Sequence, residues 1–141
     1  MQTKIQADDT VQWLLDKMVD AVPEMLLAVL LSRDGLAIAC SRDVKRDDAE
    51  QLAAMASGLH GLAMGVQRRF NGGRVQQTVV QSERRYVLVA EAGDGARVAV
   101  LASESVDAGM MAYQAHTLVQ KVGDHLGAAS RADTPHDGEN A

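Results

Sequence analysis

Two apolar segments separated by one short turn constrain the fold of this chain most. Leu26–Leu31 contains no polar side chain, and after Ser32–Gly35 the apolar pattern resumes over Leu36–Cys40. The Asp-Gly dipeptide in this turn tolerates the positive φ angles of a hairpin. Both segments are apolar at nearly every position, which is typical of strands in a sheet covered on both faces. The sequence therefore predicts a hairpin over Met25–Ser41 inside a layered domain.

Helices are predicted on either side of this hairpin. Over Asp9–Val22 apolar residues recur with the spacing of an amphipathic helix, which Pro23 ends. Over Asp47–Arg69 the same spacing gives two separate rows. The large apolar row holds Leu52, Met55, Ala56, Leu59, Leu62, Ala63 and Val66, and the glycine row holds Ala54, Gly58, Gly61 and Gly65. At ~100° per residue the two rows are centred roughly 130° apart around the helix.

The second helix therefore has two faces that each need a partner. A glycine inside a helix costs about 1 kcal/mol relative to alanine, so three in one row require a compensating contact. Close approach of another backbone supplies one, because missing side chains let helices pack nearer. We expect the large apolar row to cover the sheet and the glycine row to meet another chain. The alternative is that the glycine row packs on the protein's own sheet and leaves the large apolar row for something else.

The second half of the chain predicts three more strands and a last helix. The strands are Arg74–Gln81, Arg85–Glu91 and Ala96–Ala102. Hairpin-length turns join them as an antiparallel meander, and the helix covers about Asp107–Leu126. Residues 128–141 are small and polar, so we expect a disordered tail. The element order α-β-β-α-β-β-β-α indicates one α+β domain over residues 8–127, a five-stranded antiparallel sheet between helices.

Composition restricts the chemistry that this domain can perform. The formal net charge is −5 and no basic stripe with interleaved aromatic residues occurs, so nucleic acid is not an expected partner. The single cysteine, Cys40, allows no internal disulfide and suits a reducing cytoplasm, where we expect the protein. No signal core or segment of transmembrane length occurs, so we expect no membrane insertion.

Sequence signatures of catalysis are also missing. The phosphate-loop pattern Gly-x4-Gly-Lys-Ser/Thr does not occur, and the four histidines lack the spacing of metal ligands. No nucleophile has a histidine placed beside it by the pattern. We therefore expect no enzymatic activity, no catalytic residues, no cofactor and no metal.

The element order, together with four segments, resembles the roadblock/dynein-light-chain domain family. The segments are the helix end Val22-Pro23-Glu24, the hairpin LLAVLLSRDGLAIACS, the small-residue helix LAAMASGLHGLAMG and the closing strand VAVLAS. The resemblance extends over about Val11–Leu126 and is to bacterial members of an actinobacterial type. It implies a profilin-like sheet of strand order 2-1-5-4-3, with the second helix on one face and the other two helices on the opposite face.

The resemblance also implies partners. Family members are homodimers joined through the second helix and the third strand, and some regulate or scaffold Ras-like small GTPases. We thus expect a Ras-like small GTPase in a bacterial signalling system, with a sensor-kinase-like protein as a further partner. The alternative is a small-molecule-sensing or purely structural dimerisation module. Against a sensor, the core has few aromatic groups to define a ligand pocket.

These implications give two sets of candidate site residues. For the homodimer interface we expect Ala54, Gly58, Gly61, Gly65, Val75, Gln77 and Val79. For the contact with the GTPase we expect the exposed flank of the second helix at His60, Gln67 and Arg68.

Overall fold

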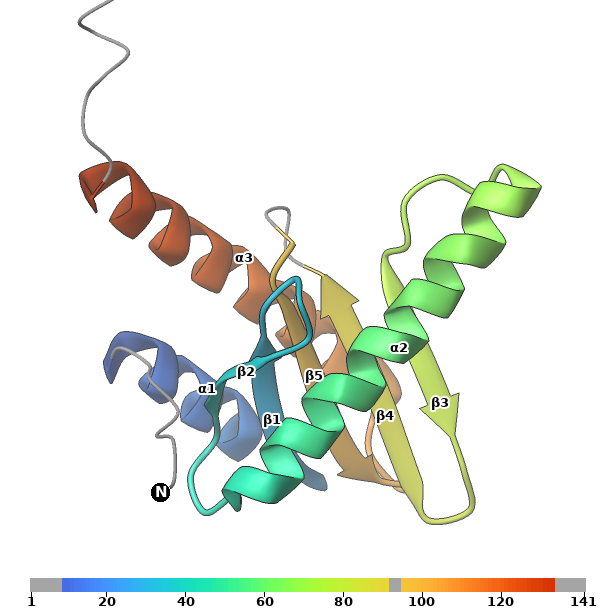
Figure 1. Cartoon of the computed structure of the whole chain (residues 1–141). Coiled ribbons are helices and arrows are strands. Elements are labelled where there is room, and N and C mark those ends of the chain that lie inside the picture. The colour runs from blue at the N-terminus through green and yellow to red at the C-terminus, as the bar shows by residue number, and fades with distance from the viewer. Residues whose placement is uncertain (1–8, 92–94, 134–141) are drawn as a thin grey trace, which may run out of the picture.

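A computed structural model describes residues 9–91 and 95–133 of the 141-residue chain. Within these ranges, helices and strands follow one another in the predicted order (Figure 1). Their bounds are α1 Asp9–Ala21, β1 Met25–Leu31, β2 Ala37–Cys40, α2 Arg46–Phe70, β3 Gln77–Gln81, β4 Arg85–Glu91, β5 Arg97–Ser103 and α3 Ala108–Asp133. Among the helices so described, none is long and apolar enough to cross a membrane.

The strands form one sheet in the order β2-β1-β5-β4-β3, and every neighbouring pair is antiparallel. This order confirms the predicted fold. In the β1–β2 hairpin, the backbone N–H of Ser32 donates to the carbonyl oxygen of Leu36 at 2.9 Å. Between them Gly35 has a φ of +84°, which a residue without a Cβ adopts at little cost. The Asp-Gly turn is therefore a three-residue loop in which glycine fills one left-handed position.

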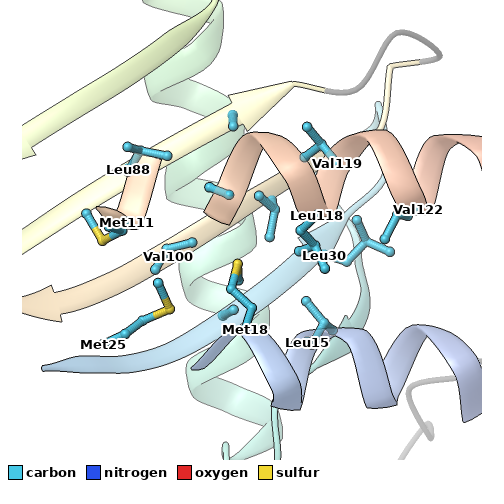
Figure 2. Packing of buried hydrophobic residues seen from close by; sticks show 14 of the residues in the cluster. Leu15, Met18, Met25, Leu30, Leu88, Val100, Met111, Leu118, Val119 and Val122 are labelled. Carbon is cyan, nitrogen blue, oxygen red and sulfur yellow. The ribbon is translucent and has the colours of Figure 1, made fainter. Parts of the chain in front are cut away.

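Two layers of helix enclose the sheet. α1 and α3 cover one face and α2 covers the other (Figure 1). Successive strand residues alternate between the two sides, so Leu30 packs with α1 and α3 whereas Leu31 packs with α2. The larger buried cluster lies on the α1 and α3 side, where Met111 lies near Val100 and Leu15 lies near Leu30 (Figure 2). Both faces are thus apolar and covered, which explains the uninterrupted apolar strands.

The connection from α2 to the sheet is longer than predicted. Asn71 ends α2 in the left-handed conformation, with a φ of +60°, and Gly73 has a φ of +81°. These two reversals turn the chain back toward the sheet before pairing begins. β3 therefore starts at Gln77 and not at Arg74.

The last helix also extends further than predicted. α3 continues through Gly127 to Asp133, so the predicted helix end at Leu126 is wrong. One glycine costs a helix only about 1 kcal/mol, and the alanines that follow it favour helix. The rest of the predicted disordered tail, 134–141, lies outside the described residues.

Candidate protein-interaction surface

α2 rests on the sheet through its smallest side chains. Its buried residues are Ala49, Ala53, Ala56 and His60. The three alanines are fully buried against strand residues such as Val29 and Leu31. Because interiors are close-packed, large strand side chains leave room only for a methyl group on the helix. The prediction that the large apolar row covers the sheet is therefore wrong for most of its members.

The large apolar row of α2 is turned toward solvent. Its exposed members, with the adjoining Phe70, are Met55 at 58%, Leu62 at 72%, Val66 at 53% and Phe70 at 75%. Leu59 of the same row is half-buried, and Ala63, one turn further on, lines a groove against β3. The row therefore runs along the β3 side of the helix. Adjacent exposed apolar side chains of this size mark interaction surfaces.

The glycine row of α2 faces open space on the opposite flank. A Cβ added to Gly58, Gly61 or Gly65 would meet no described atom within 4 Å, apart from the helix's own backbone. The alternative that this row packs on the protein's own sheet is therefore wrong. Ser57, one turn before Gly61, lies against Gly35 in the β1–β2 turn, so the row faces away from β3. No contact in the described part of the protomer offsets the helix cost of these glycines.

β3 is an edge strand, as predicted, and within the described sheet it pairs only with β4. Its two valines, Val79 and Val80, are 38% and 40% exposed. Val80 pairs with Val87, which packs against the cluster beneath α2, so Val80 continues the apolar surface of α2 to the sheet edge. An open edge with bare valines is a template for another strand.

The residues predicted near β3 for the homodimer lie in three different environments. Val75 is only 9% exposed, so its side chain offers a partner little surface. Gln77 points to the other face of the sheet, where its Oε1 lies 3.0 Å from Nε2 of His116 in α3. Val79 shares that face by strand alternation and is exposed at the edge. Of the two valines in β3, the one beside α2 is therefore Val80, which the sequence reasoning did not select.

His60, predicted on an exposed flank, is buried between α2 and the sheet with 1% of its surface exposed. Its Nε2 lies 3.1 Å from Oε1 of Glu91 at the end of β4, and within the described structure neither ring nitrogen makes a hydrogen bond of good geometry. Burial lowers the pKa of His60, the nearby Arg97 lowers that pKa further, and Glu91 opposes both. The prediction that His60 lies on an exposed flank is wrong, because His60 follows Ala56 by four residues and so shares its sheet-facing row.

The other two residues predicted to contact a partner lie at the end of α2. Arg68 is exposed, and Gln67 is half-buried beside the groove between α2 and β3. Arg68 follows Gly61 by seven positions and Gly65 by three, so it extends the glycine row. The glycine row and Arg68 thus form one continuous exposed face.

The remaining groups of the described chain do not assemble a reactive site. No cluster of three histidine, cysteine or acidic side chains in the described ranges is placed to hold a metal. Burial, and then the charge of Asp16, raise the pKa of the half-buried Cys40 thiol, which disfavours the nucleophilic thiolate. Grooves of about 290 Å³ between α1 and α3 and about 480 Å³ between α2 and β3 lie at the surface. The arrangement is suited to contact with other proteins.

Comparison with known proteins agrees with this geometry. The family model of the Roadblock/LC7 domain matches residues 11–102. The crystal structure of a Roadblock/LC7 domain from Streptomyces avermitilis is 39% identical with a TM-score of 0.78, covering 82% of this chain and 96% of that one. Myxococcus xanthus MglB is 10% identical with a TM-score of 0.77, covering 87% and 99%. Acanthamoeba castellanii profilin IA is 12% identical with a TM-score of 0.58, covering 81% and 97%. At such low identity, the likeness to MglB and to profilin IA shows the fold alone. A separate comparison with curated proteins found no match.

Proposed function

The chain belongs to the Roadblock/LC7 domain family, and from this premise we propose that it is a non-enzymatic, homodimeric regulator or scaffold of a Ras-like small GTPase in a bacterial signalling system. One observation carries the proposal: α2 exposes two different faces that no described part of the protomer covers. Two uncovered faces on one helix call for two partners. A second copy of the chain and a GTPase are the pair that the family resemblance suggests.

We assign the large apolar row of α2 and the β3 edge to the homodimer. These surfaces are continuous, because Val80 extends the apolar row to the edge of the sheet. Edge-to-edge pairing of two β3 strands would bring the second α2 alongside this row, on the same face of the sheet. Covering a side chain such as Leu62 stabilises by about 1.5–3 kcal/mol, and two-fold symmetry counts each contact twice.

We assign the glycine row and Arg68 to the GTPase. The glycine row was first expected at the homodimer interface, but it lies on the flank of α2 that faces away from β3. Missing side chains let a partner's backbone approach the helix closely. The guanidinium of Arg68 adds a positive charge that would speed association with an acidic surface more than it prolongs binding. The sensor-kinase-like protein stays a further proposed partner, with no surface assigned to it.

The test is binding of a co-encoded Ras-like GTPase, loaded with either GDP or a non-hydrolysable GTP analogue, by titration calorimetry. We expect tighter binding in one nucleotide state, and no nucleotide turnover by this protein alone. Arg68→Glu should slow association, while Lys121→Glu, the same charge change on the exposed α3 surface, should not. Equal or absent binding in both states would contradict nucleotide-state recognition and favour a structural or ligand-sensing module.

A further inference from the structure

A groove lies between α1 and α3, the two helices on the face of the sheet opposite α2. Its floor is aliphatic, because Leu14 and Met18 of α1 and Leu118 of α3 line it. Met18 and Leu118 lie between the two helices (Figure 2). The groove has a volume of about 290 Å³. A cavity of about 150 Å³ holds one benzene molecule, so this groove has room for about two apolar side chains of a docked protein segment.

The walls of the groove add an aromatic ring and two lysines. Tyr113 lines the groove from α3 and has 69% of its surface exposed. Lys17 of α1 and Lys121 of α3 line it from the two opposite walls, and both are exposed. Neither lysine forms an ion pair with another described residue, and the ammonium of Lys17 lies 4.8 Å from the ring centre of the exposed Trp13. The groove is therefore an apolar strip between two positive charges.

The charge of this groove is opposite to that of the whole chain. The formal net charge is −5, yet no acidic residue is among the described residues that line the groove. The acidic side chains of α1 are held on its other side. The backbone N–H of Arg42 donates to Oδ1 of Asp16 at 2.7 Å, and Nη1 of Arg42 lies 2.9 Å from Oδ1 of Asp20. Because α1 presents Lys17 here and not an acid, an acidic partner is complementary to the groove.

The length and the two-walled shape of the groove fit a helix. The groove extends from Leu14 to Ala21 along α1 and from Tyr113 to Lys121 along α3. At 1.5 Å per residue this is about 11–12 Å, or two helical turns. A third helix laid between two helices sets its apolar stripe on the floor and the positions beside the stripe against the walls. Acidic residues at those positions would face Lys17 on one side and Lys121 on the other. A proline-rich segment prefers aromatic walls, and Tyr113 is the one aromatic residue among the described residues of the lining.

We propose that the groove between α1 and α3 binds an amphipathic helix of a partner protein, with one apolar stripe and acidic residues on both sides of that stripe. The surfaces assigned to a second copy and to the GTPase lie on α2 and β3. The protein can therefore hold this helix and the GTPase at the same time. The inference goes beyond the proposed function and does not depend on it.

Trp13 makes this binding measurable in the full chain. It is the single tryptophan, it is exposed and it lies beside Lys17, so a helix in the groove should shift its fluorescence to shorter wavelength. The probe is a tryptophan-free peptide of about 14 residues, a length near the minimum for a helix in water. Leucine forms its apolar stripe, glutamate flanks the stripe, and alanine and glutamine fill the other positions.

A matched peptide with lysine in place of every glutamate separates local charge from net charge. The chain carries a net charge of −5, so long-range attraction favours the lysine peptide. The wild type should nevertheless bind the glutamate peptide more tightly, because Lys17 and Lys121 contact it directly. The double variant Lys17→Glu with Lys121→Glu should reverse this preference.

Single variants locate the peptide in the groove. Lys17→Glu and Lys121→Glu should each raise the Kd of the glutamate peptide about three- to tenfold, because an attractive contact becomes a repulsive one. Lys45→Glu, the same change next to the start of α2, should alter the Kd less than about twofold. Thr117→Phe places a ring in the space of the docked side chains and should raise the Kd about tenfold.

Several results would overturn the proposal. They are a preference of the wild type for the lysine peptide, an unchanged Kd in both Lys17→Glu and Lys121→Glu, or no fluorescence shift with the glutamate peptide up to about 1 mM. A shift with vesicles of phosphatidylcholine and phosphatidylserine, but not with the peptide, would show a membrane-binding surface in its place. The Kd of the peptide should be the same with and without the loaded GTPase. Competition between the two would refute a separate site, whereas peptide binding without GTPase binding would contradict only the proposed function.

Discussion

Replacing Gly58, Gly61 and Gly65 with alanine should stabilise the protomer and weaken GTPase binding together. A Cβ at any of the three positions meets no described atom outside the helix's own backbone within 4 Å, so the added methyl groups cause no clash inside the protein. The change in the free energy of unfolding then comes only from the difference in helix propensity between alanine and glycine. Most surface substitutions in a protein are neutral or destabilising, so a gain of this kind would be informative.

The expected size follows from three interior helix positions. Each glycine-to-alanine change is worth about 0.8–1 kcal/mol, so the triple variant should gain about 2.5–3 kcal/mol in the free energy of unfolding. For a domain of this length that gain corresponds to a rise in Tm of about 10 °C. Each added methyl group should also keep a partner's backbone from the helix, at a cost of about 1–3 kcal/mol for overpacking a close contact.

Urea unfolding at a fixed protein concentration measures the stability, and calorimetry with the loaded GTPase measures the binding. Concentration is held constant because dimerisation itself adds to the apparent stability. If the triple variant is no more stable than the wild type, the conclusion that the glycine row makes no contacts within the protomer is refuted. If the triple variant binds the GTPase normally but dimerises poorly, the glycine row belongs to the homodimer interface, as the sequence analysis expected.

Three further predictions concern the interior and the end of the chain. Ala53→Leu should lower the free energy of unfolding in urea by about 1–3 kcal/mol, because Ala53 is fully buried where α2 meets the sheet. A loss below about 0.5 kcal/mol, which is typical of surface substitutions, would contradict this packing. The folded-state pKa of His60 is lowered, so its contribution to stability is complete above its unfolded pKa of about 6.5 and is lost as pH falls below that value. Acid should therefore destabilise the wild type more than His60→Gln, and identical pH profiles would count against a buried neutral imidazole. A chain truncated after Ser130 should melt within a few degrees of the full chain, since the removed residues have little apolar surface to bury; a large drop in Tm would show that they are docked.

Much of the fold follows from local patterns in the sequence. Local sequence patterns predict the β1–β2 hairpin and the β3–β5 meander. The amphipathic spacing of apolar residues predicts α1. The covered faces of the sheet follow from strands that are apolar at nearly every position. The strand order came from the family resemblance, because local patterns do not say that β1 pairs with β5.

The orientation of α2 could not be read from hydrophobicity, and the error has a physical cause. A helix normally buries its largest apolar residues, but α2 meets a face already filled by Val29, Leu31 and Val89. Only alanines fit there, so Met55 and Leu62 point outward. A fully buried row of Ala49, Ala53 and Ala56 carries almost no hydrophobicity signal, although its spacing is that of a helix face.

His60 was misplaced for a related reason. A polar side chain is expected at the surface unless a partner compensates it, and the partner here, Glu91, comes from a strand 31 positions later in the chain. Such a pair cannot be inferred from one sequence. The assignment of partner contacts to α2 and β3 stays a prediction, and the structure corrects only the exposure expected for some of their side chains, such as His60.

Amide hydrogen exchange of β3 as a function of protein concentration tests the central claim most directly. If a second copy covers the β3 edge and the apolar row of α2, exchange across Gln77–Gln81 should slow as the dimer fraction rises. Exchange in α1, on the other face of the sheet, should not change with concentration. Protection of β3 that is the same in monomer and dimer, or a concentration effect confined to α1 and α3, would contradict the account.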